Sequence, residues 1–298
     1  KSQPAFCCGF FFFFIYITLL SLNIQHSFNN SVQVLTIIFM LFQIKSYLQF
    51  LWHSKNEHGV HSPFVFSLVT KCFYDKKNKP EYTIIKDYRN ALLKNKNTID
   101  VTDFGAGSRV FKSNKRQISR IAKTAGISSK RAELLFRITQ YFQPKSILEI
   151  GTSLGLATSA LALGNPKAKL TTLEGCHETS KIAKEQFQQF NFNTIESITS
   201  QFESFLNADN LYLKNYNLIY FDGNHSKEAT LAYFEQLLPT INNETLWIFD
   251  DIHWSSAMEE AWEQIKEHPK VRVTIDTFQW GFVFFREEQA KEHFTIRL

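Results

Sequence analysis

The sequence predicts an α/β fold, in which a mostly parallel seven-stranded sheet follows a mainly helical N-terminal region. From Lys145 onward, short apolar runs alternate with longer segments that have helical periodicity. Strands separated by helices of about ten or more residues are joined by right-handed crossovers, which make neighbouring strands parallel. The last two apolar runs are separated only by a short link followed by Gly281, so we expect the final strand to run antiparallel.

The expected elements of this C-terminal region, residues 145–298, follow from the spacing of its apolar residues. Seven segments are expected to be strands: 146–150, 169–174, 194–199, 217–222, 245–250, 271–276 and 280–285. Five segments are expected to be helices: 154–164, 177–190, 202–208, 225–238 and 254–268.

Residues 40–144 are expected to form a helical cap region. The expected helices are 64–72, which Pro63 can open, 82–94, 118–125 and 129–142. The last of these has Ser128 and Ser129 as cap candidates and must close before Pro144.

Two features of the cap region have more than one interpretation. The segment Asp103–Ser108 resembles a nucleotide-binding loop, but no second strand ending in an acid follows it, so we expect a tight turn that borders the active site. The basic residues between Lys112 and Arg131 either form a solvated helix face or surround an anionic acceptor.

The first 39 residues differ from the rest of the chain. Residues 5–24 contain no charged side chain, and a second apolar run covers residues 32–44. An uncharged run of about 20 residues can span a bilayer as a helix. The chain does not begin with Met, and Met40 stands where the composition changes. Residues 1–39 are therefore interpreted as non-native upstream sequence, a processed leader or a membrane anchor, and a buried helix also stays open.

Bulk composition sets weaker limits. The net charge of +5 argues only faintly for a polyanionic partner. The cysteines Cys7, Cys8, Cys72 and Cys176 have no metal-ligand spacing, which fits a reduced, cytoplasmic protein. The protein would be membrane-anchored if the N-terminal apolar segment were native, and a membrane contact is expected only through residues 5–44.

The most specific motif is the segment Ser146–Gly155. An apolar strand ends there in an acid and two glycines, Gly151 and Gly155, before an Ala/Leu-rich helix. Such a strand–loop–helix brings backbone and a helix N-terminus close to a ligand. The next expected strand ends in Glu174, 19 residues after Gly155, where an acid can hold a ribose hydroxyl pair. The dinucleotide fingerprint Gly-x-Gly-x-x-Gly is not matched, because residue 153 is Ser.

The motif resembles the S-adenosylmethionine (SAM) site of class I methyltransferases, over residues 145–298, about half of the chain. The resemblance implies a Rossmann-like sheet with a terminal antiparallel hairpin. It also implies a set of cofactor-binding residues, namely Glu149, Gly151, Thr152, Ser153, Gly155, Glu174, Gly175 and Asp222.

Three carboxylates follow two neighbouring strands of the expected sheet: Asp222, Asp250 and Asp251. Carboxyl ends of parallel strands lie at one edge of a sheet, and converging carboxylates repel one another unless a cation lies among them. Oxygen ligands suit Mg²⁺, Ca²⁺ or Mn²⁺. The pattern resembles the cation-dependent, catechol or caffeoyl-CoA type of O-methyltransferase. Alternatively, Asp222 could cap the helix near Ser226, and the Asp250–Asp251 pair could cap the helix after Trp254.

These families have a lysine base three residues after the first Asp, where this chain has His225. Histidine can act as a general base near neutral pH, so His225 and Asp222 are the candidate catalytic residues. The alternative is a surface or capping histidine.

The predicted activity is SAM-dependent O-methyl transfer to a small hydroxylated molecule, assisted by Mg²⁺ or another divalent cation. An RNA or protein methyltransferase and a non-catalytic SAM-binding or membrane-associated module are the alternatives. The chain lacks the Asn/Asp-Pro-Pro-aromatic motif of base amino-group methylation and any Pro-Cys nucleophile, so nucleic acid is not favoured as a partner. The acceptor and a homodimeric state stay open.

Overall fold

The computed structural model of the chain describes residues 30–104, 113–207 and 216–298, with side chains from residue 37 onward. The chain divides into two units, Lys1–Lys45 and Ser46–Leu298. Helix α2 (Asn30–His53) begins in the first unit and ends in the second. No helix within the described ranges is both long enough and apolar enough to cross a bilayer. The uncharged run 5–24 lies outside the described residues.

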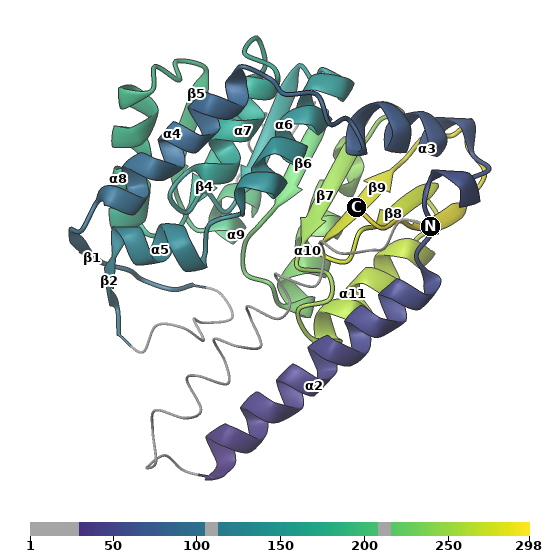
Figure 1. Cartoon of the computed structure of the whole chain (residues 1–298), viewed down its shortest axis with the longest axis horizontal. Helices are drawn as coiled ribbons and strands as arrows, with labels where there is room; N and C mark the ends of the chain where they lie inside the picture. The colour runs from purple at the N-terminus through teal and green to yellow at the C-terminus, as the bar shows by residue number, and fades with distance from the viewer. Residues whose placement is uncertain (1–29, 105–112, 208–215) are drawn as a thin grey trace. The chain divides into compact units, whose positions relative to one another are not determined.

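The second unit is built on an eight-stranded sheet with the order β10-β8-β9-β7-β6-β3-β4-β5 (Figure 1). Its strands are β3 (Ser146–Ile150), β4 (Lys169–Glu174), β5 (Ile195–Thr199), β6 (Leu218–Phe221), β7 (Leu246–Asp250), β8 (Val273–Asp276), β9 (Trp280–Phe284) and β10 (Glu292–Thr295). The seven predicted strands are confirmed, and each begins and ends within two residues of the expected bounds.

The directions of the strands are also as expected. Strands β5, β4, β3, β6 and β7 pair in parallel, and β9 runs antiparallel to both β7 and β8. The sequence did not indicate β10, which pairs in parallel with β8 at the edge of the sheet. Its four residues contain one buried side chain, Phe294, so it has too little apolar alternation to be recognised as a strand.

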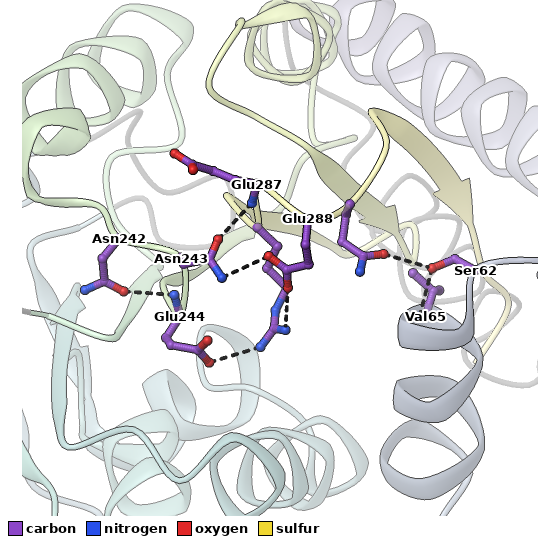
Figure 2. Close-up of polar contacts among 9 residues, drawn as sticks. Ser62, Val65, Asn242, Asn243, Glu244, Glu287 and Glu288 are labelled. Carbon is purple, nitrogen blue, oxygen red and sulfur yellow. Dashed lines mark hydrogen bonds and ion pairs between the residues drawn. The ribbon is translucent and has the colours of Figure 1, made fainter.

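The connection from β9 to β10 is tied to the segment before β7, as Figure 2 shows. Asn243 donates to the Glu288 carboxylate at 2.9 Å and accepts from the backbone N–H of Glu287 at 2.8 Å. Arg286 pairs with Glu244 at 3.0 Å and with Glu288 at 3.1 Å. The Glu244 and Glu288 side chains are largely exposed, so each ion pair contributes little to stability. Together with the Asn243 hydrogen bonds, these pairs hold the chain on its way to β10.

The helices of the second unit agree with the predicted segments. They are α3 (Pro63–Leu68), which a π-helical turn (Val69–Phe73) continues, α4 (Glu81–Lys94), α5 (Ile118–Thr124), α6 (Ser129–Phe142), α7 (Leu156–Gly164), α8 (His177–Gln189), α9 (Phe202–Asn207), α10 (Lys227–Leu237) and α11 (Ser256–Glu267). A short antiparallel pair, β1 (Thr98–Asp100) and β2 (Lys115–Gln117), precedes α5.

Helix α6 begins and ends as its sequence dictates. The Ser128 hydroxyl accepts from the backbone N–H of Arg131 at 3.3 Å, which satisfies one of the free donors of the first turn. The helix closes at Gln143, which has a left-handed backbone with φ +47°, because Pro144 disfavours a helical conformation in the residue before it.

Alternate strand residues face two different cores. Leu218 and Ile248 point to the side covered by α3 to α8, whereas Ile219 and Phe249 point to the side covered by α9 to α11. The predicted cap region 40–144 contributes Tyr88 and other residues to the first of these cores. Residues 46–144 therefore pack with the sheet in one unit.

Gly281 in β9 gives a test of how tightly the second core is packed. A Cβ atom there would lie 2.6 Å from the ring of Trp262, which is itself buried and cannot move aside. Gly281→Ala is expected to lower the free energy of unfolding by about 1–3 kcal/mol because of overpacking. Urea unfolding measures the change. Gly59→Ala is the control, because its Cβ would meet only the flexible Lys55 side chain, and equal effects of the two variants would refute the packing explanation.

Candidate active site

The loop between β3 and α7 needs both of its glycines. Gly151 has φ +107°, and a Cβ there would overlap the backbone carbonyl of Asp222. Gly155 has φ +78°, and a Cβ there would lie 2.5 Å from the Tyr88 hydroxyl and from the Phe187 ring. The left-handed backbone and the missing space both exclude a side chain. The loop therefore lies directly against the end of β6.

Glu174 lies against this loop, as the motif predicts. Its carboxylate accepts from the backbone N–H of Ser153 at 2.8 Å and from that of Cys176 at 2.9 Å. Burial raises the pKa of Glu174, and these N–H donors partly offset that effect. Two carboxylate oxygens with one donor each keep lone pairs for further hydroxyl donors. Binding of a ribose at Glu174 stays a prediction.

The other N–H groups of the loop are already engaged. Those of Gly151 and Thr152 donate to the carbonyl of Leu173 at 3.0 Å, and that of Gly155 donates to the carbonyl of Thr152 at 2.8 Å. A ligand at this loop would therefore depend mainly on Glu174.

Glu149 lies beneath the loop rather than at its surface. Its side chain is fully buried and accepts from the hydroxyls of Thr158 and Thr172, both at 2.5 Å. The Thr172 oxygen in turn lies 2.6 Å from that of Thr152. Because Thr172 donates to Glu149, Thr152 donates to Thr172, and this chain of hydrogen bonds joins Glu149 to the loop. Burial raises the pKa of Glu149 to about 8.

The start of the loop-like segment 103–108 borders this site. A Cβ on Gly175 would lie 2.9 Å from the Phe104 ring, so the ring covers the residue after Glu174. Asp103 pairs with Arg116 at 3.2 Å. Residues 105–108 lie outside the described part of the chain.

A second polar cluster lies where β6 and β7 end. The buried Tyr220 hydroxyl lies 2.9 Å from Asp250 Oδ2 and 3.3 Å from Asp222 Oδ2, so it bridges the two predicted carboxylates. Asp222 Oδ1 lies 3.5 Å from His225 Nε2. The backbone N–H of Asp251 donates to Asp250 Oδ1 at 2.8 Å. The structure therefore brings Asp222, Asp250, Asp251 and His225 together.

Arg131 in the first turn of α6 is the cation of this cluster. Its Nη2 forms an ion pair with Asp250 Oδ1, and its guanidinium lies over the Trp280 ring at 4.7 Å. Burial would raise the pKa of Asp250, but the charge of Arg131 and the hydrogen bonds from its neighbours together outweigh burial and hold that pKa below its usual range. Burial and the charge of Asp250 raise the pKa of Asp222 well above its usual range. The pKa values of these two neighbouring carboxyl groups are thus shifted in opposite directions.

The segment after Asp251 is fixed by His253. Its Nδ1 lies 2.7 Å from Glu259 and its Nε2 lies 2.8 Å from Asp276, with the ring stacked on Phe278. Burial opposes the charged ring, but the two carboxylates raise the pKa of His253 to about 9. The histidine is therefore positively charged at neutral pH and joins α11 to the end of β8.

Both capping alternatives are wrong. Ser226 caps α10 by accepting from the N–H of Ala229 at 3.3 Å, and Ser255 caps α11 by accepting from that of Met258 at 3.2 Å. Asp222 and Asp250 are thus free of that role and instead bond to Tyr220 and Arg131.

The donor set does not fit a divalent cation as it stands. Among the residues that the structure describes, no group of three or more His, Cys, Asp or Glu side chains is arranged to hold a metal ion. Both oxygens of Asp250 already accept from Arg131, Asp251 and Tyr220. The predicted metal ligands Asp222, Asp250 and Asp251 stay a prediction, and we derive no step through a metal.

Sequence reasoning missed the roles of Tyr220 and Arg131. Tyr220 could have been found, because strand alternation places it on the same face as Asp222 and the next acid of β7. Arg131 had one signal, a positive charge in the first turn of a helix, where the dipole disfavours it. Of the other described basic residues of that region, Lys115, Arg120, Lys123 and Lys130 are exposed, whereas Arg116 is half-buried and pairs with Asp103.

A surface hollow of about 540 Å³ lies elsewhere, at α4 and α8. Asp87, Lys94, Gln186 and Phe190 are among its lining residues. It contains no predicted site residue, so we place the site at the strand ends, where the carboxylates and the glycine loop meet.

The neutral state of Glu149 gives a prediction for pH. Its pKa is about 8 in the folded protein against an ordinary 4.5, so its contribution to stability is full below 4.5 and is lost as the pH rises through 8. Glu149→Gln removes this titration. The stability of the native protein relative to this variant is expected to fall steadily across urea unfolding at about pH 5, 7 and 9. A difference that stays constant with pH would contradict a buried neutral carboxyl.

Comparisons with known proteins agree with this architecture. Residues 148–252 match the family model described as "Methyltransferase domain". No curated protein matches the sequence. The SAH-bound methyltransferase PaMTH1 of Podospora anserina has a TM-score of 0.53 at 14% identity, covering 76% of this chain and 97% of its own. The O-methyltransferase TomG of Streptomyces achromogenes, in complex with SAM and involved in tomaymycin synthesis, has a TM-score of 0.50 at 12% identity, covering 78% and 99%.

At these identities the solved structures establish a common fold. The family match covers β3 to the end of β7, which includes the glycine loop, Glu174 and the carboxylates that follow β6 and β7. Residues 148–252 therefore match a methyltransferase domain, and the chain shares its fold with methyltransferases that were solved with SAH or SAM bound.

Proposed function

We propose that this chain is a SAM-dependent methyltransferase that acts on a hydroxyl oxygen of a small acceptor, with His225 as the general base. The observation on which the proposal rests is the contact between His225 and Asp222, whose backbone touches Gly151 of the glycine loop. A candidate base thus lies at the same strand ends as the predicted cofactor site. This is where ligands bind in open α/β sheets.

The predicted cofactor site fits the group that it would hold. Glu174 has lone pairs for ribose hydroxyls, and the glycines let the loop pack closely against the end of β6 and beside Glu174. Thr152 and Ser153 complete the loop, with Glu149 supporting it from below. When bound, SAM supplies an electrophilic methyl group on a sulfonium centre.

His225 has a defined part in the transfer. A proton on Nε2, which faces Asp222, leaves the lone pair on Nδ1 to take the hydroxyl proton of the acceptor. With SAM bound, the acceptor oxygen would take the methyl group as the carbon–sulfur bond breaks, and the electron pair of that bond would stay on sulfur. General base catalysis contributes about 10²–10⁴-fold, and holding the reactants in line can contribute on the order of 7–11 kcal/mol.

TomG supports the O-methyl assignment, since it is an O-methyltransferase that shares this fold and binds SAM. A divalent cation could orient a hydroxyl and lower its pKa. The proposal does not include such a cation, because Arg131 already pairs with Asp250. The proposal also includes a small-molecule acceptor, a cytoplasmic location and a homodimeric state. These three come from the sequence alone. Screening catechols, phenols and sugars for methyl release would identify the acceptor class.

The cofactor assignment is tested at Glu174. Glu174→Gln is expected to weaken SAM binding by about 10–100-fold, because hydrogen bonds to a charged group are worth roughly 1.5–3 kcal/mol. Titration calorimetry of the full chain with SAM and with SAH gives the two affinities. Glu185→Gln, an exposed acid on α8, is the matched control and should leave both unchanged. Unchanged affinity in Glu174→Gln would remove this residue from the site.

The base assignment is tested at His225. His225→Ala is expected to lower kcat for a hydroxylated acceptor by about 10²–10⁴-fold while SAM affinity stays the same. The exposed His177, replaced in His177→Ala, serves as the control. A loss of less than about threefold would mean that another group takes the proton.

A further inference from the structure

Arg131 occupies a position that is unfavourable for a positive charge unless a partner compensates. It lies in the first turn of α6, where the Ser128 hydroxyl accepts from its backbone N–H, and the helix dipole there opposes a cation. Only 20% of its side-chain surface is exposed, and its Nε is buried without a hydrogen-bond partner among the described residues. The compensating charge is that of Asp250, whose side chain is 4% exposed.

Asp250 has little capacity left for another cation. Its Oδ1 accepts from Arg131 and from the Asp251 N–H at 2.8 Å, and its Oδ2 accepts from the Tyr220 hydroxyl at 2.9 Å. A metal ion would therefore need to displace the guanidinium or the hydroxyl. Removing one partner of such a buried pair leaves an uncompensated charge, which is strongly unfavourable.

The guanidinium is also held on its flat face. Trp280 is buried and pairs with Asp250 across β7 and β9, so the ring and the carboxylate are neighbours in the sheet. The Arg131 Cζ lies 4.7 Å from the centroid of this ring, a distance at which a cation is attracted to an aromatic face. Carboxylate and aromatic ring together form a built site for one planar cation. A spherical, hydrated metal ion has no flat face to stack on the ring.

From these contacts we infer that Arg131 is the built-in cation of the carboxylate cluster, in the place where the sequence predicted a divalent metal ion, and that this site binds no metal ion. Arg131 acts as a positioning residue: it fixes Asp250 and, through the Tyr220 hydroxyl, Asp222, which faces His225. The effect of Arg131 on catalysis rests on the proposed O-methyl transfer. The inference that the carboxylate cluster binds no metal ion does not rest on it.

The test measures Mn²⁺ binding by electron paramagnetic resonance and thermal unfolding of the full chain in MnCl₂ and in EDTA. The native protein is expected to bind no Mn²⁺ at up to about 1 mM and to unfold at the same temperature in both buffers. Arg131→Ala is expected to unfold on the order of 10 °C lower in EDTA. Mn²⁺ should then bind this variant and restore about half of the loss, because the carboxylates have lost their cation.

Two controls define the site. In the Arg131→Ala, Asp250→Asn double variant, Mn²⁺ should neither bind nor stabilise, because the charged ligand is gone. Arg137→Ala removes another arginine of α6, which bonds to the carbonyls of Cys72 and Phe73 and to the Tyr82 hydroxyl rather than to a carboxylate. This variant should unfold at a lower temperature without recovery in Mn²⁺.

The inference is overturned if the native protein binds one Mn²⁺ that Asp250→Asn abolishes, or if folded Arg131→Ala gains no Mn²⁺. If Arg131→Ala fails to fold, Mn²⁺ binding by the native protein and by Arg131→Lys tests the inference instead. Both proteins are expected to remain free of Mn²⁺. None of these measurements involves SAM or an acceptor. A failure to transfer methyl groups would therefore refute the proposed function and leave the inference about Arg131 standing.

Discussion

The close approach of Gly151 to the backbone of Asp222 is the constraint on which the rest of the site depends. The Gly151 N–H donates to the carbonyl of Leu173, and no side chain could fit between the loop and the end of β6. The ends of β3, β4 and β6 therefore meet within a few atoms of one another. This contact joins the glycine loop and Glu174 to the carboxylate cluster, so that a cofactor and an acceptor could share one site.

Strand alternation then decides what each acid meets. Glu149 and Asp250 both lie on the sheet face covered by the N-terminal helices, with Tyr220 between them on β6. Helix α7 supplies Thr158 to the first acid, and α6 supplies Arg131 to the second. Burial raises the pKa of Glu149 to about 8 despite its hydroxyl donors, whereas the guanidinium and the neighbouring hydrogen-bond donors hold the pKa of Asp250 below its usual range. The pKa values of two similar buried acids are thus shifted in opposite directions.

Much of the fold could be predicted because its signals are local. The seven strands of the predicted sheet, the hairpin link before Gly281 and the helix caps each depend on a few consecutive residues. Strand β10 forms instead by pairing with β8 at the edge of the sheet, and side chains such as Arg286 hold the segment that leads to it. Its own four residues have too little apolar pattern to identify it.

For the site, the sequence by itself determined the glycine loop, the acid that faces it and the presence of acids after β6 and β7, because chain order places parallel strand ends along one edge. Only the tertiary structure decided what neutralises those acids. Arg131 and Asp250 are separated by 119 positions, and no local pattern relates them. Their pairing follows from the packing of α6 on the sheet, which brings a buried guanidinium to a carboxylate that would otherwise require another cation.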